Sequence, residues 1–418
     1  MSAKLQPVRG TRDWIGVDYD QYKSLVDVCE ALVRHYDYSG FITPIFEDTA
    51  VFTKTLGDTS DIVGKEMYTF TDKGGESLTL RPEGTAAIVR GIISNGMTQN
   101  LPLKVFYHGP MFRYERPQAF RYRQLHQFGI ECIGVDHPLS DVEVIAMAAH
   151  LFKNLGMIDK ITLELNTLGD TESRALHRRA LVDYFSSHKQ DLSEDSQRRL
   201  TTNPLRILDS KDESDKKINQ NAPQLIEFLN DFSKNYFERV CAGLTAGGVS
   251  YVLNPHLVRG LDYYNHTAFE FTTSHLGAQG TVLAGGRYNG LVANMGGPDL
   301  PGIGWAFGIE RMLGLVTLPQ KTSEIIAVIP FDEAFENEAF ILTQNLRENG
   351  YYAEMIYTGN PGKRMKRADK MGAKKALILA GDEMARGEYI LRDLANGTQE
   401  CLRHENFKML FHAKNRVQ

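Results

Sequence analysis

Lys104-Val-Phe-Tyr-His-Gly-Pro-Met-Phe-Arg-Tyr114 and Leu125-His-Gln-Phe-Gly-Ile-Glu-Cys-Ile133 are two long strand-like runs, joined by an arginine-rich connection from Arg116 to Arg123. β-Branched and aromatic residues recur in both runs, as is typical of strands. Strands joined by so short a connection pair most readily as antiparallel neighbours. This stretch therefore predicts an antiparallel strand pair.

Shorter strand-like runs lie on both sides of this pair along the chain, with helix candidates between some of them. The runs are Glu66–Thr71, Ser77–Leu80, Ala268–Thr273 and Gly280–Ala284, and the helix candidates are Gly84–Ser94 and Asp141–Leu155. Strand pairs separated by short turns, rather than strict alternation of strands and helices, indicate a mainly antiparallel sheet flanked by helices. The predicted fold class is α+β.

The N-terminal region combines a helix pattern with a proline-bearing strand pattern. Residues 19–39 place apolar and aromatic groups at the spacing of an amphipathic helix, which Gly40 is expected to end. Phe41–Phe46 then reads as a strand that contains Pro44. A proline suits a sheet edge or an interface better than a sheet centre.

The sequence pattern changes at two further places along the chain. Between about Leu168 and Gly247 the sequence is polar with helical periodicity, which predicts a helical insertion. After Pro319–Ser323 strands and helices alternate, which predicts a second domain with a small parallel or mixed α/β sheet. Its expected elements are Ile325–Ile329, Ala334–Asn349, Ala353–Tyr357, Gly362–Met371, Ala376–Ala380, Glu388–Arg392 and Glu400–Leu402. The predicted domains are 1–320 and 324–418.

Composition narrows the class of protein. With 418 residues, 42% hydrophobic and 24% charged, the chain has an ordinary globular composition. It shows no signal peptide or membrane span, so a cytoplasmic location is expected. The four cysteines form no C-x-x-C pair and no H-E-x-x-H occurs, so no metal site is predicted from a protein motif. A net charge of −5 still permits a local basic face for nucleic acid.

Two short patterns carry arginines that suit phosphate binding. Phe112-Arg113-Tyr114-Glu115 ends a strand-like run, where a rigidly held arginine can grip a phosphate through two hydrogen bonds. Gly302–Leu313 places three glycines on a strand and its junction with a helix, and Arg311 lies in that helix. Each pattern alone has a structural alternative, a surface hairpin for the first and close strand–helix packing for the second.

The two patterns follow Gly40–Pro44 in the order of the three motifs of class II aminoacyl-tRNA synthetases. Gly40–Pro44 resembles motif 1, a dimer-interface element, while Phe112–Glu115 resembles motif 2 and Gly304–Arg311 resembles motif 3. The resemblance implies a homodimer and an ATP site, with magnesium accompanying the ATP. It implies that Arg113 holds the α-phosphate, Arg311 the γ-phosphate, Glu115 the adenine amino group and Phe128 a face of the ring.

Four further segments resemble the signatures of histidyl-tRNA synthetases. They are Leu80–Ala86, Gln127–Glu131, Leu257–Tyr264 and Ala284–Tyr288, and with the three motifs they span about residues 9 to 315. The resemblance implies that L-histidine is activated by ATP and then transferred to the 3′ end of tRNA(His). It also implies the histidine contacts: Glu83, Thr85 and Gln127 at the ammonium group, Glu131 and Tyr264 at the imidazole, and Tyr263 as a wall of the pocket. Polar partners of this kind can reject substrates that lack the matching groups by about 10⁴–10⁵-fold.

Arg259 is the predicted catalytic cation, together with Arg113 at the α-phosphate. Activation brings the histidine carboxylate onto the α-phosphorus of ATP, and a cation fixed between these two anions lowers the barrier. The family places this arginine where other class II enzymes use a metal. The structural alternative is an ion pair with Asp262 or another carboxylate.

The C-terminal part carries a basic helix pattern. Its members are Lys363, Arg364, Lys366, Arg367, Lys370, Lys374 and Lys375. Such a face can contact phosphates, although a solvated lysine-rich helix gives the same pattern. Because Ile325–Leu402 resembles the anticodon-binding domain of the family, RNA binding is favoured, with Arg364 and Arg367 as tRNA contacts.

Two non-synthetase alternatives share this fold. A regulatory subunit of the histidine-biosynthetic phosphoribosyltransferase would lack the phosphate arginines or the RNA-binding domain, whereas Arg113, Arg259 and Arg311 are all present. A tRNA-sensing domain would accompany a kinase, and the chain has no kinase motif set. Phe120 and Asn289 depart from the usual family pattern, and Phe120 stands in the motif 2 connection, where a small residue is common.

Overall fold

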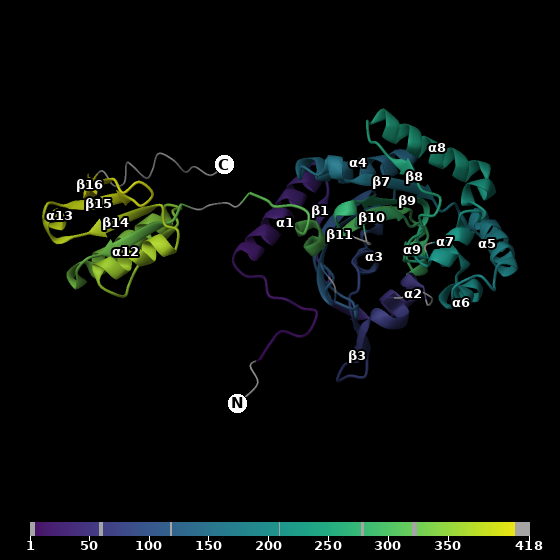
Figure 1. The fold of residues 1–418 in the computed structure, drawn as a ribbon, viewed down its shortest axis with the longest axis horizontal. Coiled ribbons are helices and arrows are strands. Elements are labelled where there is room, and N and C mark those ends of the chain that lie inside the picture. Colours follow the sequence, from purple (N-terminus) through teal and green to yellow (C-terminus); the bar gives the residue numbers. More distant parts are fainter. Residues whose placement is uncertain are drawn as a thin grey trace. The chain divides into compact units, whose positions relative to one another are not determined.

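The computed structural model describes residues 5–57, 62–117, 119–208, 210–276, 280–319 and 324–405. The chain forms two compact units, Met1–Pro319 and Gln320–Gln418 (Figure 1). Each unit has its own hydrophobic core. Within the described ranges, every helix is too short or too polar to traverse a bilayer.

The first unit is built on an eight-stranded sheet of order β1-β5-β6-β11-β10-β9-β7-β8. The strands are β1 Ser39–Gly40, β5 Leu103–Phe112, β6 Gln124–Ile133, β7 Thr162–Thr167, β8 Val252–Leu253, β9 Asn265–Thr272, β10 Thr281–Arg287 and β11 Gly302–Gly308. All neighbours pair antiparallel except β1 with β5 and β7 with β8, the two edge pairs. The predicted α+β class with a mainly antiparallel sheet is confirmed.

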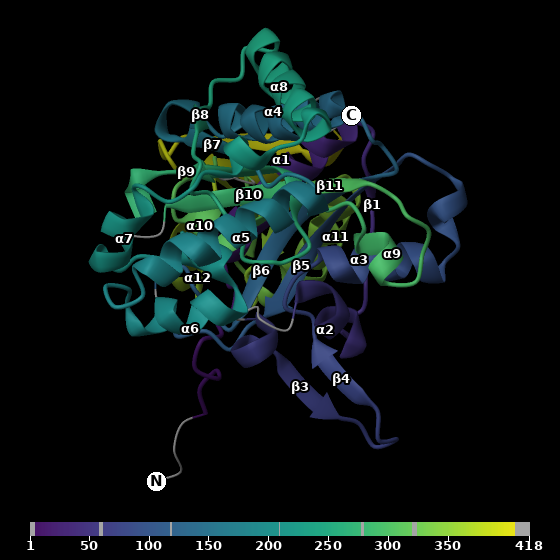
Figure 2. The same cartoon turned by 90° about the vertical axis from the view of Figure 1, so that its right-hand side faces the viewer.

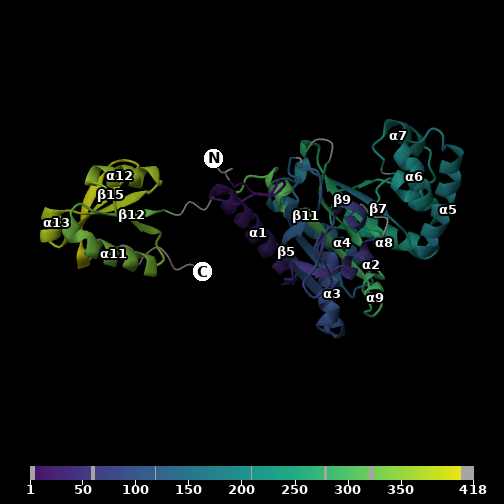
Figure 3. The same ribbon diagram turned by 90° about the horizontal axis from the view of Figure 1, so that it is seen from below.

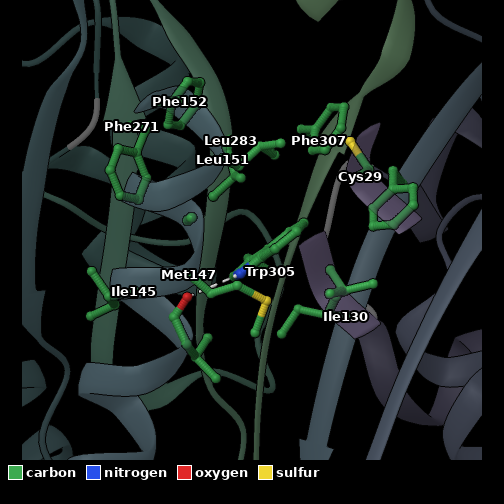
Figure 4. Close-up of a cluster of buried hydrophobic side chains, with 14 of the residues drawn as sticks. Cys29, Ile130, Ile145, Met147, Leu151, Phe152, Phe271, Leu283, Trp305 and Phe307 are labelled. Atoms are coloured by element: carbon green, nitrogen blue, oxygen red, sulfur yellow. Dashed lines mark hydrogen bonds between the residues drawn. The ribbon is translucent and has the colours of Figure 1, made fainter. Parts of the chain in front are cut away.

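One face of this sheet packs on α1 Val17–His35, α4 Pro138–Asn154 and α8 Asp231–Ala246, which build the larger core. Trp305 of β11 lies at its centre beside Met147 and Ile130, and its Nε1 donates to the Val144 carbonyl at 3.1 Å (Figure 4). Figure 2 shows α4 and α8 lying side by side over the sheet. Within this largely apolar layer, Asp141 of α4 and Arg287 of β10 form a buried ion pair.

The opposite face packs on α2 Ala50–Leu56, α3 Thr85–Ser94 and α9 Leu291–Asn294. Several tyrosines belong to this smaller core. A three-stranded sheet of order β2-β4-β3 lies nearby, made of β2 Phe46–Asp48, β4 Ser77–Leu80 and β3 Tyr68–Thr71. Shorter helical segments are α10 Ile309–Leu313, η1 Ile62–Glu66, η2 Met97–Gln99, η3 Ile158–Lys160 and η6 Ser274–Leu276.

The helical insertion predicted between residues 168 and 247 contains two groups of helices. A cluster with its own core comprises α5 Thr171–Ser187, α6 Glu194–Thr202, η4 Pro204–Ile207, α7 Glu213–Asn219 and η5 Leu225–Phe228 (Figure 3). Buried Asp215 ties this cluster together by accepting hydrogen bonds from the hydroxyls of Ser193, Ser196 and Ser210. The last helix, α8, packs instead on α4 and shares the main core.

The second unit is a five-stranded mixed sheet of order β13-β12-β14-β15-β16. Its elements are β12 Ile326–Pro330, η7 Glu333–Phe335, α11 Glu336–Glu348, β13 Ala353–Met355, α12 Pro361–Lys370, β14 Lys375–Leu379, α13 Gly381–Ala385, β15 Glu388–Asp393 and β16 Gln399–Arg403. The first three strands are parallel and the last two antiparallel. The alternation read from the sequence predicted such a sheet, whereas α13 was not predicted.

The N-terminal helix and strand predictions are wrong in their boundaries. The helix ends at His35 rather than at Gly40, because Asp37 adopts the left-handed conformation with φ 64°. Residues 41–45 are not a strand: β1 stops at Gly40 after pairing with β5, and β2 begins only at Phe46. Ile42 is 87% exposed, so burial does not hold this segment in a sheet.

Candidate active site

A buried carboxylate, Glu131 of β6, lies at the centre of a polar cluster on the smaller-core face. Its Oε1 accepts from the Thr85 hydroxyl at 2.7 Å and from the Tyr107 hydroxyl at 3.4 Å. Its Oε2 accepts from the Tyr288 hydroxyl at 2.6 Å. Burial raises the pKa of Glu131 to about 8, although these donors oppose the shift.

The raised pKa of Glu131 predicts a pH-dependent stability. Below its ordinary pKa of 4.5 the carboxyl is protonated in both folded and unfolded chains, so it causes no penalty. Between that value and about 8 the unfolded chain ionises while the folded chain holds its proton, which lowers the free energy of unfolding. Without histidine, the wild type should lose stability relative to Glu131→Gln as pH rises across this window, on the order of a few kcal/mol. Urea unfolding at pH 5, 6.5 and 8 measures the difference; a pH-independent difference would contradict it.

Glu83 precedes α3 and holds the start of that helix. Its two carboxylate oxygens accept from the backbone N–H groups of Thr85 and Ala86, each at 2.7 Å. Burial raises the pKa of Glu83, opposed by these two hydrogen bonds and by nearby Arg113. The contacts fix the Thr85 hydroxyl where it reaches Glu131.

Gln127 lies two residues before Gly129 and four before Glu131 on β6, so the two polar side chains share one face of the strand. The Gln127 Oε1 atom is buried and has no hydrogen-bond partner among the described residues. Buried polar atoms without partners are rare in folded proteins. The atom is therefore an acceptor available to a ligand that carries N–H donors.

Glycines of β11 make room for this cluster. A Cβ at Gly304 would lie 2.1 Å from Oε2 of Glu131, and one at Gly302 would lie 2.1 Å from the Tyr288 ring. A Cβ at Gly308 would make only an ordinary contact, with the Cβ of Arg311 at 3.8 Å. Two of the three glycines in this pattern therefore serve close packing of pocket side chains, and only the third leaves a free approach to the backbone.

Arg259 and Tyr264 come from the loop between β8 and β9. Arg259 forms an ion pair with Glu270 of β9 at 2.5 Å, and its guanidinium lies 5.0 Å from the centre of the Tyr264 ring. Its Nε is buried without a hydrogen-bond partner among the described residues. The Arg259 side chain thus has a carboxylate partner, Glu270 rather than Asp262, and retains a donor for a further one.

Of the remaining predicted ATP residues, Arg113 and Glu115 lie in the connection between β5 and β6, and Arg311 lies in α10. Arg113 donates through Nε to the Pro82 carbonyl at 2.8 Å, and Glu115 forms an ion pair with Arg121 at 3.3 Å. Burial and the neighbouring Arg121 lower the pKa of Arg311. A cleft of about 720 Å³ is lined by Arg121, Arg311 and Glu270 and also by Lys211 and Lys216 of the insertion.

The structure contradicts the prediction that Phe128 covers a face of the adenine ring. Phe128 is completely buried in the larger core, with its ring 5.8 Å from those of Phe106 and Phe307. Strand alternation directs it to the face opposite Gln127 and Glu131. On the pocket side of β6, Leu125 near the start of the strand contacts the smaller core.

Arg364 is likewise contradicted as a tRNA contact. Its guanidinium is buried, donates to the Pro330 carbonyl at 2.5 Å and to the Tyr357 carbonyl at 3.1 Å, and pairs with Glu336 at 2.9 Å. These contacts tie α12 to β12 and α11. Arg367, by contrast, is exposed on α12.

Sequence reasoning assigned no role to Tyr107 and Tyr288, whose hydroxyls both reach Glu131. Tyr288 ends the segment Ala284–Tyr288, so a signal for it was present. Tyr107 stands opposite Gly129 in the β5–β6 ladder, and a Cβ at Gly129 would lie 2.5 Å from its hydroxyl. Only the strand register reveals that contact.

The sheet brings the arginine-bearing patterns together, because β6 lies between β5 and β11. An antiparallel sheet that presents these patterns on adjacent strands, beside a pocket of buried polar groups, defines a class II aminoacyl-tRNA synthetase. A family model described as histidyl-tRNA synthetase matches residues 10–312, and one described as an anticodon binding domain matches residues 326–413.

Individual relatives agree. The chain is 54% identical over 396 residues to the histidine–tRNA ligase of Gluconobacter oxydans, covering 95% of each chain. It is 51% identical over 401 residues to that of Rhodospirillum rubrum, covering 96% of this chain and 97% of the relative. The crystal structure of apo S. aureus histidyl-tRNA synthetase matches with a TM-score of 0.83 and 35% identity, covering 98% and 100% of the two chains. The chain belongs to the histidyl-tRNA synthetase family, and its activity is that of a histidine–tRNA ligase that uses ATP.

Proposed function

We propose that the cluster around Glu131 is the histidine pocket. The observation that carries this proposal is the pair of buried acceptors on one face of β6. They are the Oε1 of Gln127, which has no hydrogen-bond partner in the described part of the chain, and the carboxylate of Glu131. Gln127, with Glu83 and Thr85, receives the ammonium group. Glu131 and Tyr264 receive the imidazole, and Tyr263 forms a wall.

The cleft beside this pocket is proposed to hold ATP. Arg113 binds the α-phosphate and Arg311 the γ-phosphate, while Glu115 accepts from the adenine amino group. Charge-assisted hydrogen bonds of this kind contribute about 1.5–3 kcal/mol each. The contact of Arg113 with the Pro82 carbonyl, next to Glu83, supports an α-phosphate site beside the amino-acid pocket.

Arg259 is proposed to act in the chemical step. The histidine carboxylate attacks the α-phosphorus and the bond to the pyrophosphate oxygen breaks, so negative charge gathers between two anions. Arg259 offers a guanidinium whose Nε is still unpartnered among the described residues. In the second step a terminal ribose hydroxyl of tRNA attacks the adenylate carbonyl and AMP leaves.

Magnesium is proposed to arrive with ATP. Across the described residues no group of three or more His, Cys, Asp or Glu side chains could hold a metal ion. Oxygen ligands suit magnesium, which commonly keeps waters and substrate phosphates in its coordination shell. The ion would then be held chiefly by the phosphates, with Glu270 as the nearest cleft-lining carboxylate to Arg259.

The protein is proposed to be a cytoplasmic homodimer in which one domain activates histidine and the other binds tRNA. Residues 1–320, with the insertion at about 168–247, activate histidine, and residues 324–418 bind the anticodon region of tRNA(His). On α12 the side chains of Lys363, Lys366, Arg367 and Lys370 are exposed, whereas Arg364 is used internally. Exposed cations on one short helix supply phosphate contacts.

Charge reversal at Arg367 tests the role of α12. Arg367→Glu should raise the Michaelis constant for tRNA and reduce the slope of log affinity against log salt by about one. Histidine-dependent pyrophosphate exchange should stay unchanged, because α12 belongs to the other unit. Arg403→Glu, an exposed arginine on β16, is the matched control. Equal loss of exchange and charging, or an equal effect of the control, would refute the assignment.

A further inference from the structure

The helical insertion contacts the loop that carries Arg259 and Tyr264. Arg206, in η4, donates through Nη2 to the Gly260 carbonyl at 2.5 Å. Arg174, in α5, donates through Nη1 to the Tyr264 carbonyl at 2.9 Å. Asn203 adds a longer contact at 3.4 Å to the Asp262 carboxylate.

These contacts hold the loop at the positions of its two proposed functional residues, Arg259 and Tyr264. Asn166 of β7 donates to the Leu257 carbonyl at 3.0 Å, which ties down the beginning of the loop, and β9 begins at Asn265. Between these anchors, Arg206 holds the carbonyl directly after Arg259, and Arg174 holds the carbonyl of Tyr264 itself. The insertion therefore fixes the backbone at both functional side chains.

A small cavity remains between the insertion and the loop, beside the apolar contact of Val258 with the insertion core. The cavity has a volume of about 50 Å³ and is lined by Arg174, Arg206, Asp262 and neighbouring leucines. A space of this size accommodates water rather than a substrate. Burial also lowers the pKa of Arg174, which marks its guanidinium as largely removed from solvent. Val258 of the loop packs against the core of the insertion, and the directed hydrogen bonds of Arg174 and Arg206 add to this contact at Tyr264 and Gly260.

We propose that Arg174 and Arg206 are positioning residues for histidine activation, holding Tyr264 and Arg259 in register with the pocket and the cleft. The inference rests on the proposed roles of Arg259 and Tyr264. A displacement of about 1 Å can cost on the order of 10²-fold in rate. Because both arginines belong to the insertion, activation depends on where the insertion lies against the sheet.

The test is steady-state pyrophosphate exchange by the full chain with Arg174→Met and Arg206→Met. Methionine keeps apolar length and removes the donors. Arg206→Met should lower kcat by about ten- to a hundredfold, and Arg174→Met should chiefly raise the KM for histidine. In both variants the KM for ATP should stay within about twofold of the wild type, because neither substitution removes a proposed ATP contact. A general loss of substrate binding would instead raise the KM for ATP as well. Arg206→Lys, which keeps a cationic donor, should recover part of the rate.

Arg178→Met is the matched control, an exposed arginine on the same helix as Arg174, and should behave as wild type. Wild-type kinetics for both Met variants would overturn the proposal. So would parallel changes in kcat and both KM values, accompanied by a lowered unfolding temperature and no rescue by lysine. Arg259→His separates failure of the proposed function from failure of this inference. If Arg259→His retains pyrophosphate exchange, the proposed catalytic role of Arg259 is wrong. If it is inactive while both Met variants behave as wild type, only the positioning role of Arg174 and Arg206 is wrong.

Discussion

Replacing Arg259 with histidine is expected to lower histidyl-adenylate formation by about 10²–10³-fold while leaving ATP binding largely intact. Activation joins a carboxylate to a phosphorus that already bears negative oxygens, so the transition state gathers charge where the ground states are separate. The Arg259 side chain is 13% exposed, and electrostatic effects are stronger at such a largely buried site than in water. A shorter imidazole cannot reach the same position with a permanent charge.

The ion pair with Glu270 makes a sharp control possible. If Arg259 served only to pair with Glu270, then Glu270→Gln should impair exchange as strongly as Arg259→His. Glutamine can still accept from the Thr281 hydroxyl, which now lies 2.6 Å from Glu270 Oε2. A catalytic Arg259 predicts a much smaller loss in Glu270→Gln. Near-normal pyrophosphate exchange by Arg259→His, measured beside equilibrium ATP binding, would rule out the assignment.

Asp141→Leu is expected to destabilise the first unit by about 3–5 kcal/mol. Asp141 and Arg287 form an ion pair with both side chains completely buried. Asp141 also accepts from the hydroxyls of Thr267 and Tyr236, so one carboxylate joins α4 to β9, β10 and α8. Its removal leaves an uncompensated guanidinium inside the protein.

Tryptophan fluorescence during urea unfolding measures this loss selectively, because Trp14 and Trp305 both lie in the first unit. The double variant Asp141→Leu/Arg287→Met should recover much of the stability, since a buried pair can often be replaced by apolar groups at little cost. Asp195→Ala, which removes an exposed partner of Arg198, should have little effect. If Asp141→Leu lowers the free energy of unfolding no more than Asp195→Ala does, the buried ion pair is not a major contribution to stability.

The antiparallel pair β5–β6 was predictable because its strand signals are long and its connection is short. The break between β1 and β2 was not. Phe41 still donates to the Phe106 carbonyl at 2.8 Å, but the chain then leaves the sheet edge. The partner strand β5 determines where the hydrogen-bonded pairing with β1 ends. The strand propensity of the residues around Pro44 therefore does not predict this end point.

The inward orientation of Phe128 and Arg364 could have been predicted from strand and helix periodicity, whereas matching to family motifs did not reveal it. In β6, Phe128 alternates with Gln127 and shares its face with Ile130, so a period of two already separates it from the pocket. In α12, Arg364 lies four residues before buried Ala368, on the inward side of the helix. Its partner Glu336 could only be identified from the tertiary structure.

Contacts between distant elements account for the rest. The Tyr107 hydroxyl reaches Glu131 through the register of β5 and β6, whereas Glu270 of β9 meets Arg259 because the loop before β9 folds back onto that strand. The insertion arginines reach the 259–264 loop from more than fifty residues earlier. Sequence patterns indicated which side chains carry chemistry, and the fold determines which neighbours hold them in place.

A crystal structure with a non-hydrolysable histidyl-adenylate analogue tests the division of labour in the site most directly. The proposed site requires an imidazole nitrogen within hydrogen-bond distance of Glu131, about 2.7–3.2 Å. It also requires the guanidinium of Arg259 to contact both the histidyl and the phosphoryl sides of the analogue. A ligand whose ring lies away from Glu131, with Arg259 bound only to Glu270, would contradict the account.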